Sequence, residues 1–303
     1  MPSLKAIRNR IASVKNTQKI TKAMKLVAAA RLRRAQDSIV AARPYAARMR
    51  DIMDDVTARL QLEAEDEDKS HPLLKKRAIK NVRLIIVSSD RGLAGGFNSN
   101  LFRRVERFIV DERERFPSVE LTILGRKGRE HFKRRRLQGV TQGLDMAAPT
   151  SEVALARARE LAQKCTEDYL EGKIDAVMVA YNEFKSAITQ TVKIEQLLPI
   201  DVSKKPVSVD KQQHAALIDF EYEPTKADVL TTLVPLYIEV ELYRVVLESI
   251  ASFFGAQMTA MDNATRNAKE MIGNLTLEFN RARQAAITKE LMEIVGGAEA
   301  LKG

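Results

Sequence analysis

Two long heptad patterns, one at each end of the chain, constrain the fold more than any other feature of the sequence. Steps of three and four residues through residues 4–60 meet an apolar side chain at fourteen of seventeen positions. The same steps through residues 233–286 meet one at fourteen of sixteen, and Ile287, Leu291 and Ile294 continue the pattern. The patterns predict helices of roughly 57 and 65 residues, about 85 and 100 Å long at about 1.5 Å per residue.

Helices of this length with a seven-residue repeat are typical of a left-handed coiled coil. Because the patterns lie at opposite ends of the chain, the simplest arrangement pairs the two helices antiparallel, with the middle of the chain inserted between them. Pro44 lies inside the first pattern and should bend that helix, since proline has no N–H to donate. The acidic run over residues 63–68 ends the pattern.

The middle of the chain has the composition of a small α/β domain. Runs of β-branched and apolar residues predict buried strands over residues 82–87, 119–124 and 174–179, and an alternating segment over 191–195 predicts an edge strand. Helical patterns lie between them, over residues 101–109 and 155–165. Ser151 is placed to cap the start of the second of these helices, and Gly172 its end. This alternation of strands and helices favours a largely parallel sheet.

The chain therefore divides into five segments. They are an N-terminal helix over residues 1–62, an acidic loop over 63–77, the α/β domain over 78–200, a connecting segment over 201–227 and a C-terminal helix over 228–303. The most apolar stretch, residues 229–247, is interrupted by Glu239, Glu241 and Arg244, so we expect no membrane-spanning helix.

The net charge of +10 is concentrated at the N-terminus. Residues 1–60 hold fourteen Lys and Arg against four Asp and Glu, and the first acidic residue is Asp37. A transit peptide, a nucleic-acid-binding arm and a surface for an acidic protein are all compatible with such an arm. The heptads run through the cations without a cleavage boundary, and no aromatic residues interleave with the basic ones. These observations favour the acidic protein partner.

A glycine-rich loop, Ser88–Phe97, follows the first predicted strand and precedes a helix. Nucleotide-binding folds place their phosphate loop at this position, but the loop matches neither of the common phosphate-loop patterns. We therefore favour a tight strand-to-helix turn over a nucleotide site. The three histidines are scattered, and the single Cys165 lies on an apolar helix face, where a packed thiol is expected. We predict no catalytic residue, no metal site and no cofactor.

The N-terminal heptad pattern is broken at three consecutive positions, Gln18, Thr21 and Lys25. Ile20, Met24 and Val27 form an apolar patch that is offset from the pattern. Either the break tunes the register of the two helices, or it marks a place where the helix pair contacts another molecule.

Three blocks of sequence resemble the gamma subunit of F-type ATP synthases, and the resemblance covers essentially the whole chain. They are residues 11–29, starting IASVKNTQKITKAM; residues 89–96, SDRGLAGG; and residues 280–298, starting NRARQAAITKEL. The resemblance implies an antiparallel coiled coil of the terminal helices with an inserted Rossmann-like α/β domain. It also implies a central rotor shaft that couples ion-driven rotation of the c-ring to conformational cycling of three catalytic beta subunits.

The resemblance further implies the partners and their contact sites. One copy of the chain would lie within a hexamer of alpha and beta subunits and bind the epsilon subunit and the c-ring, without nucleic acid. Residues that match the contacts with beta are Arg283, Gln284, Thr288, Glu290 and Met24. The glycine loop, represented by Asp90, Arg91, Gly92, Gly95 and Gly96, would lie near the rim of the catalytic ring. Tyr222 and Glu223 would face the c-ring.

Two departures from the family pattern exclude thiol regulation of the chloroplast kind. Ala94 stands where many relatives have Cys, and the two-cysteine insertion of chloroplast versions is missing. The resemblance leads us to expect a peripheral subunit on the cytoplasmic face of a bacterial plasma membrane, rather than one on the matrix side of a mitochondrial membrane. By the same resemblance it would be a non-catalytic subunit of an ATP-hydrolysing and ATP-synthesising complex.

Overall fold

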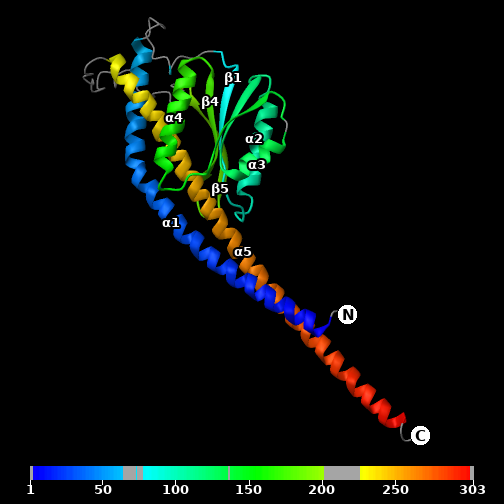
Figure 1. The fold of residues 1–303 in the computed structure, drawn as a ribbon. Helices are drawn as coiled ribbons and strands as arrows, with labels where there is room; N and C mark the ends of the chain where they lie inside the picture. Colours follow the sequence, from blue (N-terminus) through cyan, green and yellow to red (C-terminus); the bar gives the residue numbers. More distant parts are fainter. Residues whose placement is uncertain (1–2, 64–72, 74–77, 136, 201–225, 301–303) are drawn as a thin grey trace. The chain divides into compact units, whose positions relative to one another are not determined.

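The computed structural model describes residues 3–63, 73, 78–135, 137–200 and 226–300, which fall into two compact units. The first unit comprises residues 1–29 and 257–303, and the second comprises residues 30–256. Helix α1 (Leu4–Glu63, 60 residues) and helix α5 (Lys226–Ala300, 75 residues) contribute to both units (Figure 1). Both helices are somewhat longer than the heptad patterns predict, and they run through Pro44 and Pro235.

In the first unit, α1 and α5 pack as the antiparallel pair that the heptads predict. The Arg8 guanidinium lies 5.6 Å from the centre of the Phe279 ring, and Lys25 pairs with Asp262 at 2.5 Å. Residue numbers thus rise along one helix as they fall along the other. Heptad positions of this unit are buried or half-buried on both helices, whereas most positions between them are exposed. Burial therefore follows the heptad pattern, as expected for a coiled-coil seam.

The second unit contains a five-stranded sheet of order β3-β2-β1-β4-β5. Its strands are β1 (Asn81–Val87), β2 (Ser118–Leu124), β3 (Val140–Met146), β4 (Ala176–Phe184) and β5 (Gln190–Leu198). The first four are parallel, and β5 pairs antiparallel with β4 at the edge. The largely parallel sheet and the edge strand are confirmed.

Helices cover both faces of this sheet (Figure 1). One face carries α2 (Phe97–Asp111) and α3 (Arg126–Arg134), and the other carries α4 (Ala154–Leu170) and α5. Because side chains alternate along a strand, Leu84 and Ile86 of β1 join the core under α2, while Arg83 reaches Asp168 of α4. Both sets are buried, as the apolar β1 sequence predicts for a strand covered on two faces.

The two ends of α4 test the capping predictions. Gly172 has a φ of 74°, and the N–H groups of Gly172 and Lys173 donate to the carbonyls of Tyr169 and Asp168. This is a Schellman motif, which needs the left-handed conformation that glycine adopts readily. The prediction for Ser151 is wrong, because the helix starts at Ala154 and its cap position is Val153.

Two elements of the second unit were not predicted. Strand β3 is exposed at five consecutive residues, 141–145, so it lacks the apolar run of a buried strand. Helix α3 buries only Gly128 and Phe132 and is otherwise polar and basic. Neither segment carries a hydrophobic period strong enough to reveal it.

Candidate functional site

The break in the α1 heptad pattern lies opposite polar residues of α5. The Thr21 hydroxyl is 2.8 Å from the Thr265 hydroxyl, and Lys25 Nζ is 2.5 Å from Asp262 Oδ1. Thr21 is buried, while Lys25 and Asp262 are partly exposed. The hydrogen bond from Lys25 lowers the pKa of the Asp262 carboxyl, so that carboxylate is charged at neutral pH. We call Thr21, Lys25, Asp262 and Thr265 the polar layer.

The offset apolar patch on α1 lies on the surface of the first unit. Ile20 is 60% and Val27 is 52% exposed, and Met24 between them is half-buried. Leu26, on another side of the helix, is also exposed. Apolar side chains displayed next to a paired seam are available to another molecule.

The last part of α5 extends beyond the helix that pairs with it. Continuing the antiparallel register from Lys25–Asp262 and Arg8–Phe279 brings residue 283 opposite the first turn of α1, which begins at Leu4. From residue 287 to residue 297 every residue is exposed. The predicted contact residues Arg283, Gln284, Thr288 and Glu290 lie on or beside this segment, and all four are exposed.

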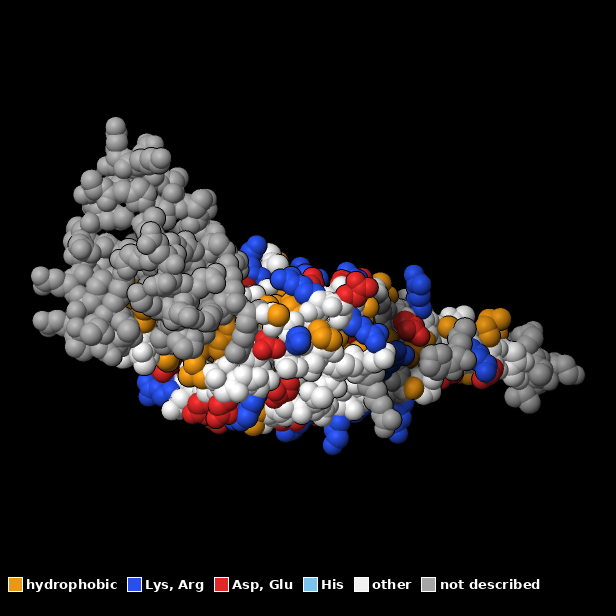
Figure 2. Space-filling model, turned by 90° about the horizontal axis from the view of Figure 1, so that it is seen from above, with side chains coloured by type: hydrophobic (Ala, Val, Ile, Leu, Met, Phe, Trp, Pro, Cys, Tyr) orange, Lys and Arg blue, Asp and Glu red, His pale blue; other side chains and the backbone are white. Residues whose placement is uncertain are grey.

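Apolar side chains are exposed along the same end of α5, among charged ones (Figure 2). Six of them are between 49% and 69% exposed: Leu277, Ile287, Leu291, Met292, Ile294 and Val295. The sequence pattern assigned Ile287, Leu291 and Ile294 to the seam. The structure instead leaves them without an intrachain partner helix within the described residues, because α1 begins at Leu4, opposite residue 283, and does not run alongside the rest of α5.

The glycine loop is held by hydrogen bonds at the carboxyl ends of three parallel strands. Asp90 Oδ1 accepts hydrogen bonds from the N–H groups of Arg126, at the start of α3, and Ala148, just after β3. Gly95 has a φ of 53°, and Gly96 is the cap residue of α2. These contacts describe a structured turn between β1 and α2.

The remaining predicted residues of this loop differ in exposure. Arg91 is exposed, and its backbone carbonyl accepts a hydrogen bond of 2.7 Å from the Ser89 hydroxyl. Gly92 has open space where a Cβ would lie, so contacts do not require glycine there. Tyr222 and Glu223 lie outside the described residues.

Helix α5 fills the crevice where a nucleotide would bind in this type of sheet. Parallel sheets bind ligands where the strand order reverses, which here is between the carboxyl ends of β1 and β4. Ser249 and Ser252 of α5 are buried there and donate to the carbonyls of Val87 and Asn182. The ring of Phe253 packs 5.4 Å from that of Phe97 at the start of α2. The geometry thus supports a turn, not a phosphate cradle.

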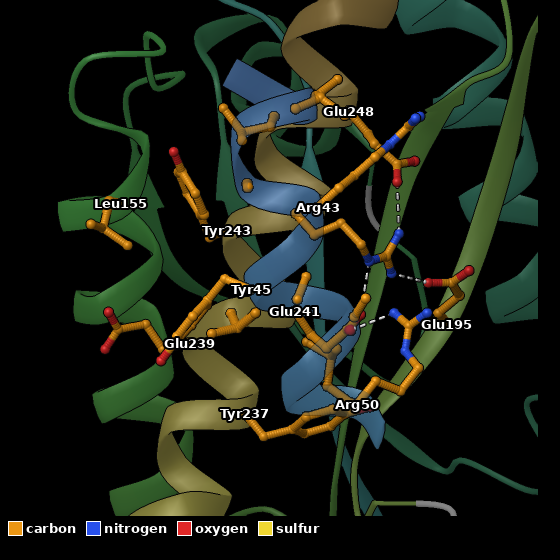
Figure 3. Close-up of a pocket in the computed structure, with 18 of the residues that line it drawn as sticks. Arg43, Tyr45, Arg50, Leu155, Glu195, Tyr237, Glu239, Glu241, Tyr243 and Glu248 are labelled. Atoms are coloured by element: carbon orange, nitrogen blue, oxygen red, sulfur yellow. Dashed lines mark hydrogen bonds and ion pairs between the residues drawn. The ribbon is translucent and has the colours of Figure 1, made fainter. Parts of the chain in front are cut away.

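A groove of about 1170 Å³ in the second unit lies between α1, α4, α5 and β5 (Figure 3). Its charged side chains balance, with Arg43, Arg50, Arg159, Lys193 and Arg244 facing Glu183, Glu195, Glu239, Glu241 and Glu248. Arg244 is the centre of the ion pairs, at 2.8 Å from Glu241, 2.9 Å from Glu195 and 2.9 Å from Glu248.

These ion pairs join three elements. Arg50 of α1 reaches Glu241 at 2.6 Å, and Arg244 links Glu241 of α5 to Glu195 of β5. Burial would raise the pKa of Glu195, but Arg244 lowers it, so that carboxylate remains charged.

In the sequence, Arg244 is only a polar residue in an apolar heptad pattern. Glutamates three residues before it and four after it are the signal that could have identified it.

Burial raises the pKa of the Cys165 thiol to about 11, which agrees with the packed thiol expected from the sequence. Within the described parts of the chain, no group of three or more His, Cys, Asp or Glu is arranged to hold a metal ion. Nor does any helix in those parts have the length and hydrophobicity needed to cross a membrane.

Comparisons with known proteins match the chain over its length. A family model described as ATP synthase matches residues 3–301. The ATP synthase gamma chain of Anaeromyxobacter sp. (strain K) is 50% identical over 303 residues, which is 100% of both chains. The gamma chain of Trichlorobacter lovleyi is 46% identical, again over 100% of both.

Chains in solved structures of ATP synthases resemble this chain as well. A chain of the central stalk and c-ring of Tetrahymena thermophila mitochondrial ATP synthase has a TM-score of 0.57 and is 25% identical, covering 81% of this chain and 99% of that one. A chain of the Euglena gracilis mitochondrial ATP synthase has a TM-score of 0.62 at 17% identity, covering 98% of this chain and 94% of that one. The second likeness supports the fold.

Proposed function

This chain belongs to the gamma-chain family of ATP synthases, and from that premise we propose how its described surfaces couple rotation to catalysis. It is the central rotor subunit of an F-type ATP synthase, which links ion-driven rotation of the c-ring to the conformational cycling of the catalytic beta subunits. The proposal is that the exposed end of α5 and the Met24 patch are the surfaces that contact beta.

The exposure of the end of α5 is the observation that carries this proposal. Six apolar side chains of this helix are each more than two-fifths exposed, and contact of apolar surface with water is unfavourable in free energy. Burial of these side chains inside a ring of partner subunits would remove that contact with water. Arg283 and Gln284 stand at the start of this segment, where a charged and an amide side chain can hydrogen-bond to a partner loop. Thr288 and Glu290 follow on the next turn.

A rod of this kind works through unequal contacts. One asymmetric helix pair cannot touch three identical beta subunits in the same way, so at each angle it stabilises a different conformation of each subunit. Rotation then exchanges those conformations, because a partner shifts an equilibrium only by its differential contacts with the two states. Torque transmission is better served by two supercoiled helices than by a single one.

The basic arm and the Met24 patch suit acidic loops of beta. Four cations of α1 make contacts within the chain: Arg8 with Phe279, Lys25 with Asp262, Arg31 with Phe254 and Arg50 with Glu241. Most other Lys and Arg side chains of α1 are exposed and available to an acidic partner. The glycine loop, with Asp90, Arg91, Gly92, Gly95 and Gly96, is proposed to lie near the lower rim of the alpha–beta ring.

The remaining partners and the location follow from the family. We propose one copy per complex, with the epsilon subunit and the c-ring bound at the end that includes Tyr222 and Glu223. The bacterial relatives support a peripheral position on the cytoplasmic face of the plasma membrane. The filled crevice between β1 and β4 supports a subunit without a catalytic site of its own.

Reconstitution tests the function directly. Alpha and beta subunits are expressed with and without this chain, and the products are separated by size exclusion and assayed for ATP hydrolysis. We expect the chain to co-elute as one copy per three alpha–beta pairs and to confer sustained turnover. A chain that elutes alone and leaves turnover unchanged would contradict the assignment.

Two further assays distinguish the alternatives that the sequence leaves open. A nucleic-acid-binding arm would bind DNA with an affinity that falls steeply as salt rises, because phosphate contacts release counterions. A nucleotide site in the α/β domain would retain ATP in equilibrium dialysis of the isolated chain. We expect neither.

A further inference from the structure

The polar layer discriminates between registers of α1 against α5 better than the apolar seam around it does. Thr21 is 8% exposed, yet its hydroxyl finds a partner 2.8 Å away on Thr265, and one turn along α1 Lys25 meets Asp262 at 2.5 Å. Apart from Gln18, the other seam positions of the first unit hold apolar side chains, and some of these are small, such as Ala28 and Ala268, both of which are buried. Small apolar side chains pack closely but discriminate poorly between registers.

A shift of one helix by a heptad shows what the layer discriminates against. Such a shift moves the helices by about 10 Å and keeps apolar positions against apolar positions. In one direction it brings Thr21 against Ile272 and Lys25 against Lys269. That register separates the two hydroxyls, which keep only their hydrogen bonds to the Gln18 and Met261 carbonyls of their own helices. It also places the two cations together, which costs free energy.

A heptad shift in the opposite direction also removes the polar partners of Thr21 and Lys25 on α5. It brings Thr21 against Met258 and leaves Lys25 opposite Gly255, which offers no side chain. Only the observed register gives every member of the layer a polar partner. Polar residues at core positions of coiled coils are known to select one register at some expense of stability.

We propose that the polar layer formed by Thr21, Lys25, Asp262 and Thr265 locks the antiparallel register of α1 and α5. Lys25 and Asp262 are then positioning residues. They determine how far the Met24 patch on α1 stands from Arg283 on α5, which is 21 residues or about 30 Å along the helix from Asp262. A shaft whose two helices slip would present these surfaces to beta at the wrong heights.

Disulfide formation measures the register directly. The T21C/T265C variant replaces two hydroxyls that lie 2.8 Å apart, and it leaves Lys25–Asp262 as the remaining pair of the polar layer. A heptad slip of about 10 Å would separate these positions beyond the roughly 7 Å between Cα atoms that a disulfide tolerates. Cys165 is 1% exposed and should not compete.

The yield is measured on the full chain assembled with alpha and beta, by mass spectrometry after mild oxidation. We expect Asp262→Lys to lower the yield at least threefold, and the additional Lys25→Asp exchange to restore it. Glu270→Lys is the matched control: Glu270 is exposed on the same helix, and the substitution changes the net charge by the same amount. Equal yields for D262K and E270K, or no recovery in the exchange, would overturn the proposal.

A second variant covers the case in which D262K does not assemble. Lys25→Met with Asp262→Leu replaces the pair by apolar side chains, which should keep helical content by circular dichroism while lowering the disulfide yield. An undiminished yield in K25M/D262L would also overturn the proposal. The ratio of protons pumped to ATP hydrolysed is a separate measurement that rests on the proposed function. Its failure alone would leave the register lock intact and contradict only its role in coupling.

Discussion

The Ser252 hydroxyl of α5 donates a hydrogen bond of 2.8 Å to the backbone carbonyl of Asn182 near the carboxyl end of β4. This contact places the C-terminal helix inside the crevice that related parallel sheets use for ligands. The α/β domain therefore holds the shaft helix at the position where an enzyme of similar topology would hold a nucleotide.

Filling of this crevice predicts that Ser252 tolerates little change. Ser252 is 0% exposed, so Ser252→Leu overpacks the site and should lower the free energy of unfolding by about 1–3 kcal/mol. Ser252→Ala removes one hydrogen bond and should cost about 1 kcal/mol. Urea unfolding of the full chain, followed by circular dichroism, measures both. Ser99→Ala is the control, because Ser99 is exposed; an equal effect there would argue against a packed crevice.

The buried ion pair between Arg83 and Asp168 predicts a pH-dependent contribution to stability. Nη1 of Arg83 is 2.7 Å from Oδ2 of Asp168, whose side chain is 3% exposed. Burial alone would raise the pKa of Asp168, but hydrogen bonds from Arg83 and Lys164 lower it. A folded-state pKa below the unfolded value gives stabilisation that is present above the unfolded pKa of about 3.9 and is lost as pH falls through the folded pKa.

Asp168→Asn should therefore destabilise the chain by about 3 kcal/mol at pH 7, and by less at pH 3. Urea unfolding at the two pH values gives the difference between variant and wild type. Asp111→Asn, at an exposed carboxylate of α2, is the control and should change little at pH 7. A difference for D168N that is the same at both pH values would contradict the assigned ion pair.

The proposed beta contact predicts a loss of turnover when Arg283 or Gln284 is truncated. Loss of one charge-assisted hydrogen bond, about 1.4 kcal/mol or more, should slow ATP hydrolysis by the reconstituted complex about tenfold for Arg283→Ala, and by less for Gln284→Ala. Arg281→Ala is a matched control, because Arg281 is exposed two residues away on another side of the helix. If R283A assembles normally and turns over like R281A, the contact is wrongly assigned.

The Met24 patch predicts a defect in coupling, not in assembly. Met24→Lys adds a cation to a half-buried apolar position next to the seam, and it should bind an acidic loop of beta too tightly. We expect fewer protons pumped per ATP hydrolysed, with partial recovery at high salt because screening weakens the pair. Leu26→Lys adds the same charge on another side of α1 and should keep normal coupling. Unchanged pumping in M24K would refute this assignment.

Burial of Cys165 predicts an unreactive thiol. With a pKa of about 11, only about one thiol in a thousand is ionised at pH 8, and the side chain is 1% exposed. Iodoacetamide should label the folded chain at least a hundredfold more slowly than the chain in urea. Rapid labelling of the folded chain would mean that α4 does not pack as described.

The glycine loop and the groove show the limits of prediction from residues alone. The position of the loop between strand and helix left both a nucleotide site and a turn open, and only the contacts of Asp90, Ser249 and Ser252 favour the turn. Arg244 was visible only as a polar residue in an apolar pattern. Its partner Glu195 lies 49 residues away on β5, a separation that no local pattern reports.

The sequence by itself determined the helix pair. Heptad periodicity is a local property, so it predicted which faces of α1 and α5 are buried, and the apolar runs likewise predicted β1, β2 and β4. The tertiary structure alone decided the weakly patterned elements β3 and α3, the pairing of Lys25 with Asp262, and the end of the seam at Ile287. These features depend on which distant residues meet, and on where a partner helix ends, and a one-dimensional pattern of hydrophobicity carries neither.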